Sequence, residues 1–199
     1  GVDYQREIDE YGIEKAHNFL FIIGPRSVTS PYCRKEIDLA VKLNKRIIPL
    51  LHVKSDEFLN QTHPIISKIN WILFQEGIND FEESFANLIG VIQKQADYVE
   101  QQTQILAKAL EWERHQKQTS YLLIGEEKKQ AESWLKIRFK HEQQPCLPTD
   151  LHCEFITEST KNANNLMAQV FLAYAEEDES VMEQIRNSLR RERFSVLTN

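Results

Sequence analysis

Residues 19–23 read Phe-Leu-Phe-Ile-Ile and stop at Gly24-Pro25. Five consecutive apolar residues that end at such a break are typical of a short strand buried on both faces, as in a parallel sheet covered by helices. Ser30-Pro31 predicts that a helix begins next, because serine caps a first turn and proline fits its first position. The apolar positions expected to face inward from this helix are Cys33, Ile37, Ala40 and Val41.

Further strand–helix units follow. Residues 47–51 form a second apolar run, in which Pro49 predicts a strand near the sheet edge or a local break in the ladder. Residues 71–74 predict a third strand, and Asp80 predicts the start of a helix. The inward positions of that helix are expected to be Phe81, Phe85, Leu88 and Ile92. Strand–helix alternation at this spacing indicates an α/β fold with right-handed crossovers.

The pattern changes after this unit. Residues 96–165 offer helical periodicity without a convincing strand, and their tryptophans are expected in a helical core. The tail then returns to the α/β pattern, with an apolar run at 170–174, an acidic turn at 176–178, a helix and a strand at 194–197. An amphipathic helix is also expected at 4–17.

Composition excludes several classes of protein. The formal net charge is −6 and no basic stripe appears, which argues against a nucleic-acid binder. Cys33, Cys146 and Cys153 are too few and too scattered for a disulfide framework or a zinc site, so they are expected to be reduced thiols in a cytoplasmic protein. No apolar run has the length of a membrane-spanning helix.

Several segments together resemble the TIR (Toll/interleukin-1 receptor homology) domain. Residues 19–40 resemble a buried strand and the helix of the family's second half, including Ser-Pro-Tyr-Cys-Arg-Lys-Glu-Ile at 30–37. Residues 45–51 and Asn70-Trp71 continue this likeness, and 170–178 resemble the family's first box. The stretch around 121–155 is similar to a helical segment of multi-domain bacterial TIR proteins. The resemblance implies a flavodoxin-like parallel sheet with an all-α spacer.

The order of these segments departs from that of the family, because the opening box lies at the far end of the chain. Residues 1–95 are therefore expected to be the back part of one TIR domain, 96–165 a helical spacer, and 166–199 the opening of a second, tandem TIR domain. A second hypothesis is that the two partial sets complement each other, within one chain or between two swapped chains. Neither set contains the family's substrate-covering loop, so the fragment alone is expected to be inactive.

The resemblance implies a site for NAD as a substrate, with no permanently bound cofactor and no metal. Glu36 corresponds to a glutamate that assists loss of nicotinamide in NAD-cleaving members, where a carboxylate stabilises positive charge on the ribose. Tyr174, Phe171 and Cys33 are expected at the nucleotide pocket. The alternatives are a solvent-facing Glu36, sheet packing for Tyr174 and Phe171, and a core position for Cys33.

The resemblance thus implies a cytoplasmic signalling module, as in bacterial immunity, whose partners are other TIR domains in a homo-oligomer or a domain-swapped dimer. It would cleave NAD to nicotinamide and an ADP-ribose product when assembled, as an NAD glycohydrolase. The alternative is a catalytically silent scaffold that only recruits other TIR domains. A phosphoacceptor receiver domain would need an aspartate at the end of a central strand, and the strand ends here are Gly24-Pro25, His52-Val53 and Gln75.

Overall fold

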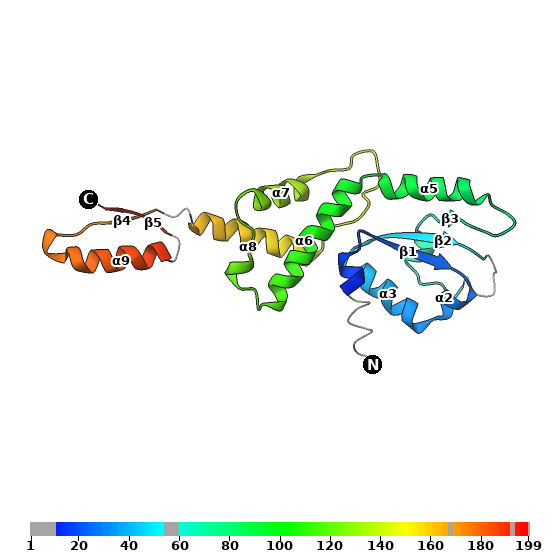
Figure 1. Ribbon diagram of the computed structural model, residues 1–199, viewed down its shortest axis with the longest axis horizontal. Helices are drawn as coiled ribbons and strands as arrows, with labels where there is room; N and C mark the ends of the chain where they lie inside the picture. The colour runs from blue at the N-terminus through cyan, green and yellow to red at the C-terminus, as the bar shows by residue number, and fades with distance from the viewer. Residues whose placement is uncertain (1–10, 54–59, 167–168, 192–193, 199) are drawn as a thin grey trace.

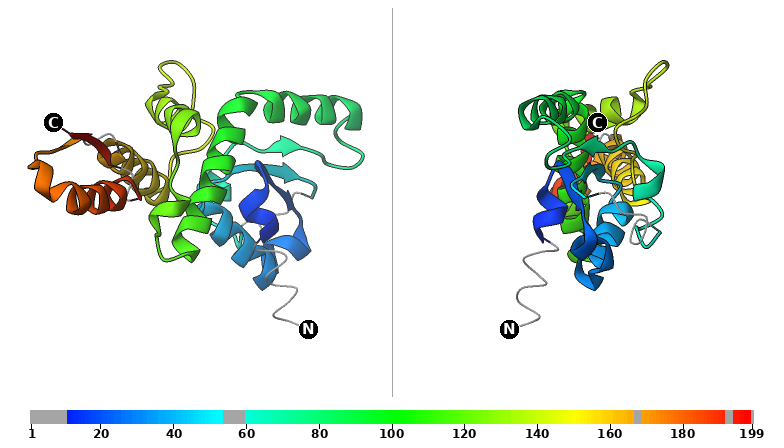
Figure 2. Two further views of the ribbon diagram at one scale, coloured as in Figure 1. Left: turned by 60° about the vertical axis from the view of Figure 1, so that its left-hand side comes forward. Right: turned by 90° about the vertical axis from the view of Figure 1, so that its right-hand side faces the viewer.

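The computed structural model describes residues 11–53, 60–166, 169–191 and 194–198. Figure 1 shows three parts in a row: an α/β part that contains β1 to β3, a helical part that contains α6 to α8, and a small α/β part that contains β4, α9 and β5. The left-hand view of Figure 2 keeps this order. The helical part therefore separates the two sheets of the chain.

The first part contains a three-stranded parallel sheet in the order β1-β2-β3. Its strands are β1 (Asn18–Ile23), β2 (Arg46–Leu51) and β3 (Ile72–Leu73). The expected parallel α/β fold is therefore confirmed, although β3 is shorter than the predicted 71–74. Of the helix expected at 4–17, residues 11–15 are helical and the first ten residues lie outside the described part.

Helices cover the two faces of this sheet unequally. On one face α2 (Pro25–Thr29), α3 (Pro31–Lys42) and the 3-10 turn η1 (Ile66–Lys68) enclose a core. The core residues on this face are Phe21, Ile23, Val28, Ile37, Leu51 and Ile66. On the other face α5 (Phe81–Gln93) packs over Ile48, Leu50 and Ile72 through Leu88. Both expected helix caps form: Ser30 Oγ accepts from Cys33 N, and Asp80 Oδ1 accepts from Glu83 N.

The prediction that β1 is buried on both faces is wrong. Phe21 and Ile23 are buried under α2 and α3, but Leu20 is 40% and Ile22 57% exposed on the opposite face. The reason is that α5 lies over β2 and β3 and leaves β1 uncovered. Three residues that were expected to face inward from helices are exposed as well: Val41, Phe81 and Phe85.

The expectation that Pro49 marks a sheet edge or a break is also wrong, because β2 is the central strand and its register continues through the pair Phe21 and Pro49. His52 N donates to Ile23 O, so alternate residues before His52 direct their N–H groups toward β1. Pro49 alternates with these residues, so its backbone nitrogen points toward β3. Pairing between β2 and β3 begins only at Leu50. The missing N–H of proline therefore removes no ladder hydrogen bond.

The helical part consists of α6 (Ala96–Arg114), the turn η2 (Thr119–Tyr121), α7 (Gly125–Lys136) and α8 (Asp150–Leu166). Its core contains the expected tryptophans, Trp112 and Trp134, which are 2% and 1% exposed. Trp134 Nε1 donates to Tyr98 O, so the indole is satisfied within the core. No helix in the described part of the chain is long and apolar enough to span a bilayer.

A polar contact that we call the joint attaches the helical part to the first sheet. The joint is formed by residues 43–46, which end α3 and begin β2, against α6, the end of α5 and the segment before α8. Asn44, at a left-handed φ of 49°, turns the chain there. The hydrogen bonds across the joint are Gln102 Nε2 to Leu43 O (3.0 Å), Asn44 Nδ2 to Pro148 O (3.0 Å), Lys45 Nζ to Thr103 Oγ1 (3.1 Å), and Arg46 Nη1 and Nη2 to Lys94 O (2.6 Å) and Ile92 O (2.7 Å).

The third part is a two-stranded parallel sheet with one helix. It comprises β4 (Gln169–Leu172), the turn η3 (Glu176–Asp178), α9 (Glu179–Arg191) and β5 (Ser195–Thr198). The strand expected at 170–174 thus starts one residue earlier and ends at Leu172. Met182 of α9 is buried, whereas Phe171 and Leu197, which are paired in the register, are exposed.

Replacing Arg46 should destabilise the joint. Arg46 is buried and its guanidinium donates to Asn18 Oδ1 as well as to the two carbonyls at the end of α5. We expect Arg46→Met to lower the free energy of unfolding by about 3 kcal/mol, because three partly buried acceptors lose a charged donor. Urea denaturation measures this loss. The exposed pair Lys129–Glu126 is the control: Lys129→Ala should cost less than about 0.5 kcal/mol.

His152 should make the stability fall on acidification. It is fully buried, its Nδ1 accepts from Thr149 N and its Nε2 donates to Gln102 O, and burial lowers its pKa from 6.5 to about 4. Between these two values the unfolded chain binds a proton that the folded chain does not, so stability is lost as the pH falls below 6.5. We expect a contribution of about 2 kcal/mol between pH 7 and pH 5.

Urea denaturation of wild type and His152→Gln at both pH values isolates this contribution. The variant should lose less stability than wild type between pH 7 and pH 5, whereas a change at the exposed His115, His115→Gln, should leave the pH dependence intact. Equal pH dependence in wild type and His152→Gln would contradict the assignment.

Candidate functional site

Glu36 lies in the second turn of α3, on a helix whose start is fixed by the Ser30 cap. Its side chain is half-buried, and Tyr32, four residues earlier and so on the same side of the helix, is exposed. Cys33 is half-buried against the core under α3. Cys33 therefore takes the packing position that was its alternative interpretation, and a role in nucleotide binding stays a prediction.

A histidine ties the loop before β3 to the same helix. His63 Nε2 lies 3.0 Å from Asp38 Oδ1, and His63 Nδ1 accepts from Ile65 N at 3.2 Å. Because Nδ1 is an acceptor, Nε2 carries the hydrogen and donates to the carboxylate. This contact holds the loop at 60–69 beside α3, the helix that carries Glu36.

Phe171 and Tyr174 lie in the other sheet. Phe171 is exposed on β4, and Tyr174 is half-buried beyond the end of that strand. In Figure 1 the helical part separates β4 from α3. Within one chain the four predicted site residues thus form two distant groups, Cys33 with Glu36 and Phe171 with Tyr174.

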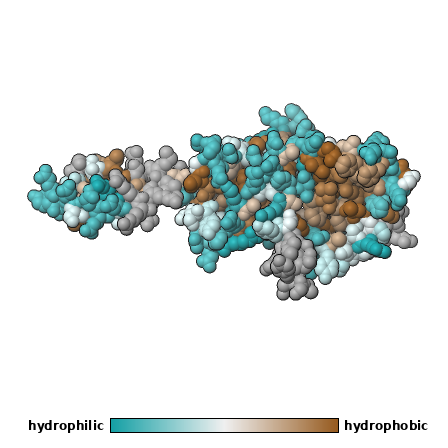
Figure 3. Space-filling view, in the orientation of Figure 1, coloured by the Kyte–Doolittle hydropathy of each residue, from teal (hydrophilic) through white to brown (hydrophobic). Residues whose placement is uncertain are grey.

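An apolar groove of about 590 Å³, which no pattern in the sequence indicated, lies at the carboxyl ends of β1, β2 and β3. We call it the α5 groove. The apolar residues that line it are Ile22, Leu50, Phe74, Phe81, Phe85 and Leu88. Figure 3 shows the corresponding apolar surface over the first sheet and α5. The groove lies on the face of α5, whereas Glu36 and Cys33 belong to α3 on the opposite face.

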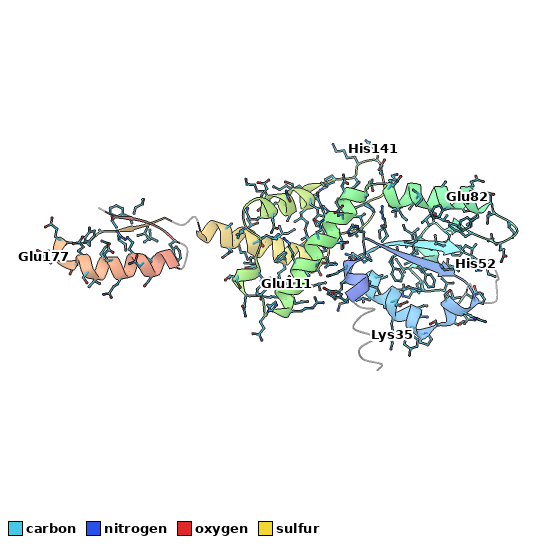
Figure 4. All side chains as sticks on the ribbon, viewed as in Figure 1. Lys35, His52, Glu82, Glu111, His141 and Glu177 are labelled. Carbon is cyan, nitrogen blue, oxygen red and sulfur yellow. The ribbon has the colours of Figure 1, made fainter. Side chains whose placement is uncertain are left out.

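Two hydrogen bonds hold the rim of the α5 groove. His52 Nδ1 lies 3.4 Å from Phe74 O, and Asn79 Oδ1 accepts from Gln75 N at 3.1 Å. Gly77 allows the turn between them, with a φ of 72°. Figure 4 shows His52 beyond the end of β2, with Glu82 on the nearby α5. The groove therefore suits apolar side chains better than a charged substrate.

Burial shifts the pKa of several groups in the joint and in the helical part. Burial lowers the pKa of Lys45 to about 8, and burial raises the pKa of the Cys146 thiol to about 11. These groups and His152 belong to the joint and to the helical part, where they serve packing. Within the described residues, no group of three or more His, Cys, Asp or Glu side chains could hold a metal ion.

The sequence profile of the TIR domain family matches residues 1–89. No curated protein and no solved structure matches the chain significantly. The matched segment contains the first sheet, α3 with Glu36, and most of α5. The second TIR domain expected in the tail lies outside this match and stays a prediction. The segment 1–89 belongs to the TIR domain family, and this protein is a TIR domain protein.

Proposed function

We propose that this protein is a signalling module that self-associates through its TIR segment and cleaves NAD when assembled. The observation that carries the catalytic part is the place of Glu36: a half-buried carboxylate on a capped helix inside the TIR segment. The uncovered face of β1 supports self-association, because an apolar face of this kind marks an interaction surface.

Glu36 would act by electrostatic stabilisation. The bond between C1′ of the ribose and the nicotinamide nitrogen breaks, its electron pair leaves with nicotinamide, and positive charge develops on the ribose ring. A carboxylate next to the ring stabilises that charge and orients the ribose hydroxyls. Water then adds to C1′, loses a proton, and completes ADP-ribose.

A silent scaffold is the second candidate, and a specific observation favours it. Phe171 and Tyr174 lie in a different part of the chain from Glu36, so a single copy does not assemble the predicted pocket. The α5 groove is also lined largely by apolar side chains, and His52 and Asn79 at its rim bind neighbouring backbone groups. Both features suit a protein whose TIR surface only recruits other TIR domains.

Nicotinamide release from NAD by concentrated protein separates the two candidates. We expect Glu36→Ala to lower the rate by about 100-fold or more, as with loss of other charge-stabilising groups. Glu111→Ala, at an exposed position of α6, is the matched control and should retain the wild-type rate. Circular dichroism and light scattering must show that all three proteins are folded and equally associated.

No release from folded, self-associated wild type would establish the scaffold. Nicotinamide release that persists in Glu36→Ala would show that Glu36 is not needed for catalysis.

A further inference from the structure

We propose that the β4–α9–β5 unit of one copy docks into the α5 groove and along the free edge of β1 in a second copy, and that the exchange is reciprocal. The proposal deepens the proposed self-association and rests on it, since it names the surfaces that meet. The two sheets of the chain are each incomplete in a way that the other can complete.

The first sheet lacks a neighbour at one edge and a cover on one face. Among the described residues β1 pairs only with β2, which leaves the other side of β1 open. Ile22, 57% exposed, faces the α5 groove together with exposed Phe81 and Phe85. Parallel sheets normally carry helices on both faces, and an open strand edge invites a further strand.

The third part has the matching surfaces. Within the described chain β4 and β5 pair only with each other, so this sheet also has open edges. On α9 Met182 is buried against the sheet, whereas Val181 and Ile185 are exposed. These two are one turn apart and lie on the same side of Met182, about 100° and about 60° around the helix from it, so they form an apolar stripe along the side of α9. A helix with such a stripe can fill a groove beside its own sheet.

The handedness of the crossovers selects which strand meets β1. The connection from β1 to β2 passes through α3 on one face. A right-handed connection that moves across the sheet in the opposite direction, from β1 away from β2, places its helix on the other face. If β4 pairs with β1, then β5 lies further out and α9 falls on the face of the α5 groove. If β5 paired with β1, α9 would fall on the face that α2 and α3 already cover.

The occupant is a second copy because of where the tail lies. Figures 1 and 2 place β4, α9 and β5 on the far side of the helical part from β1. The tail of one chain is thus presented outward, toward another molecule. Parallel pairing of β4 with β1 brings the carboxyl ends of both strands to one edge of the joined sheet. Tyr174 of one copy would then reach the end of the joined sheet that carries the first turns of α3, the helix of Glu36.

Light scattering and cross-linking of the full chain test the docking. Wild type should have twice the 23.4 kDa mass of one chain. Ile22→Asp should weaken the dimer by about 100-fold or more, because a carboxylate would be buried in an apolar contact. Ile124, 54% exposed on the helical part, is the matched control, and Ile124→Asp should leave the dimer intact.

Cross-linking tests the specific contact between two copies. In a Cys33→Ser/Cys153→Ser background, Ile22→Cys protein mixed with Val181→Cys protein should form a bismaleimide-linked heterodimer. The mixture of Ile124→Cys with Val181→Cys should not. Salt supplies a further readout: α5 and α9 both begin with acidic turns, which would lie at the same end of the joined sheet, so salt should tighten the dimer.

A folded wild type that stays monomeric at high concentration would overturn both the docking and the proposed self-association. A dimer that survives Ile22→Asp, fails to cross-link from 22 to 181, or is weakened by salt would overturn the docking alone. In that case self-association would use another surface, and the assignment of Glu36 would be tested separately by nicotinamide release.

Discussion

The joint at residues 43–46 is the constraint on which the arrangement of the chain depends. A buried lysine and a buried arginine stand side by side there, and each is tolerated because its donors meet acceptors on neighbouring elements. Arg46 binds the carbonyls at the end of α5, and Lys45 reaches α6. The contact fixes the start of β2, the carboxyl end of α5 and α6 of the helical part in one polar cluster.

That cluster sets the direction in which the chain leaves the first sheet. Because α5 is held at its carboxyl end by Arg46, it lies over β2 and β3 and cannot also cover β1. The face of β1 that bears Ile22 is left open as a consequence. The α5 groove is thus a product of how one helix is anchored, and the helical part carries the second sheet away from it.

The proposed function depends on contact between two separate parts of the protein, the TIR segment and the tail. The family match covers the segment that holds Glu36, and its catalytic role remains our proposal. Phe171 and Tyr174, two of the residues proposed for the nucleotide, belong to the other α/β part of the chain, so the proposed site would be completed only between copies. Assembly and chemistry would then be coupled, because a monomer would hold the charge-stabilising carboxylate without the opposite wall of the pocket.

The sequence by itself determined the local elements. Apolar runs, the Ser30 and Asp80 caps and the helical spacing predicted the strands and helices closely, since hydrophobic periodicity and capping act over a few residues. It also singled out Glu36 through motif resemblance. Only the tertiary structure decided burial: Ile22, Phe81 and Phe85 are as apolar as core residues, and whether they are covered depends on which strands α5 packs against. The position of Pro49 in a central strand likewise depended on where β3 begins to pair, which no local pattern encodes.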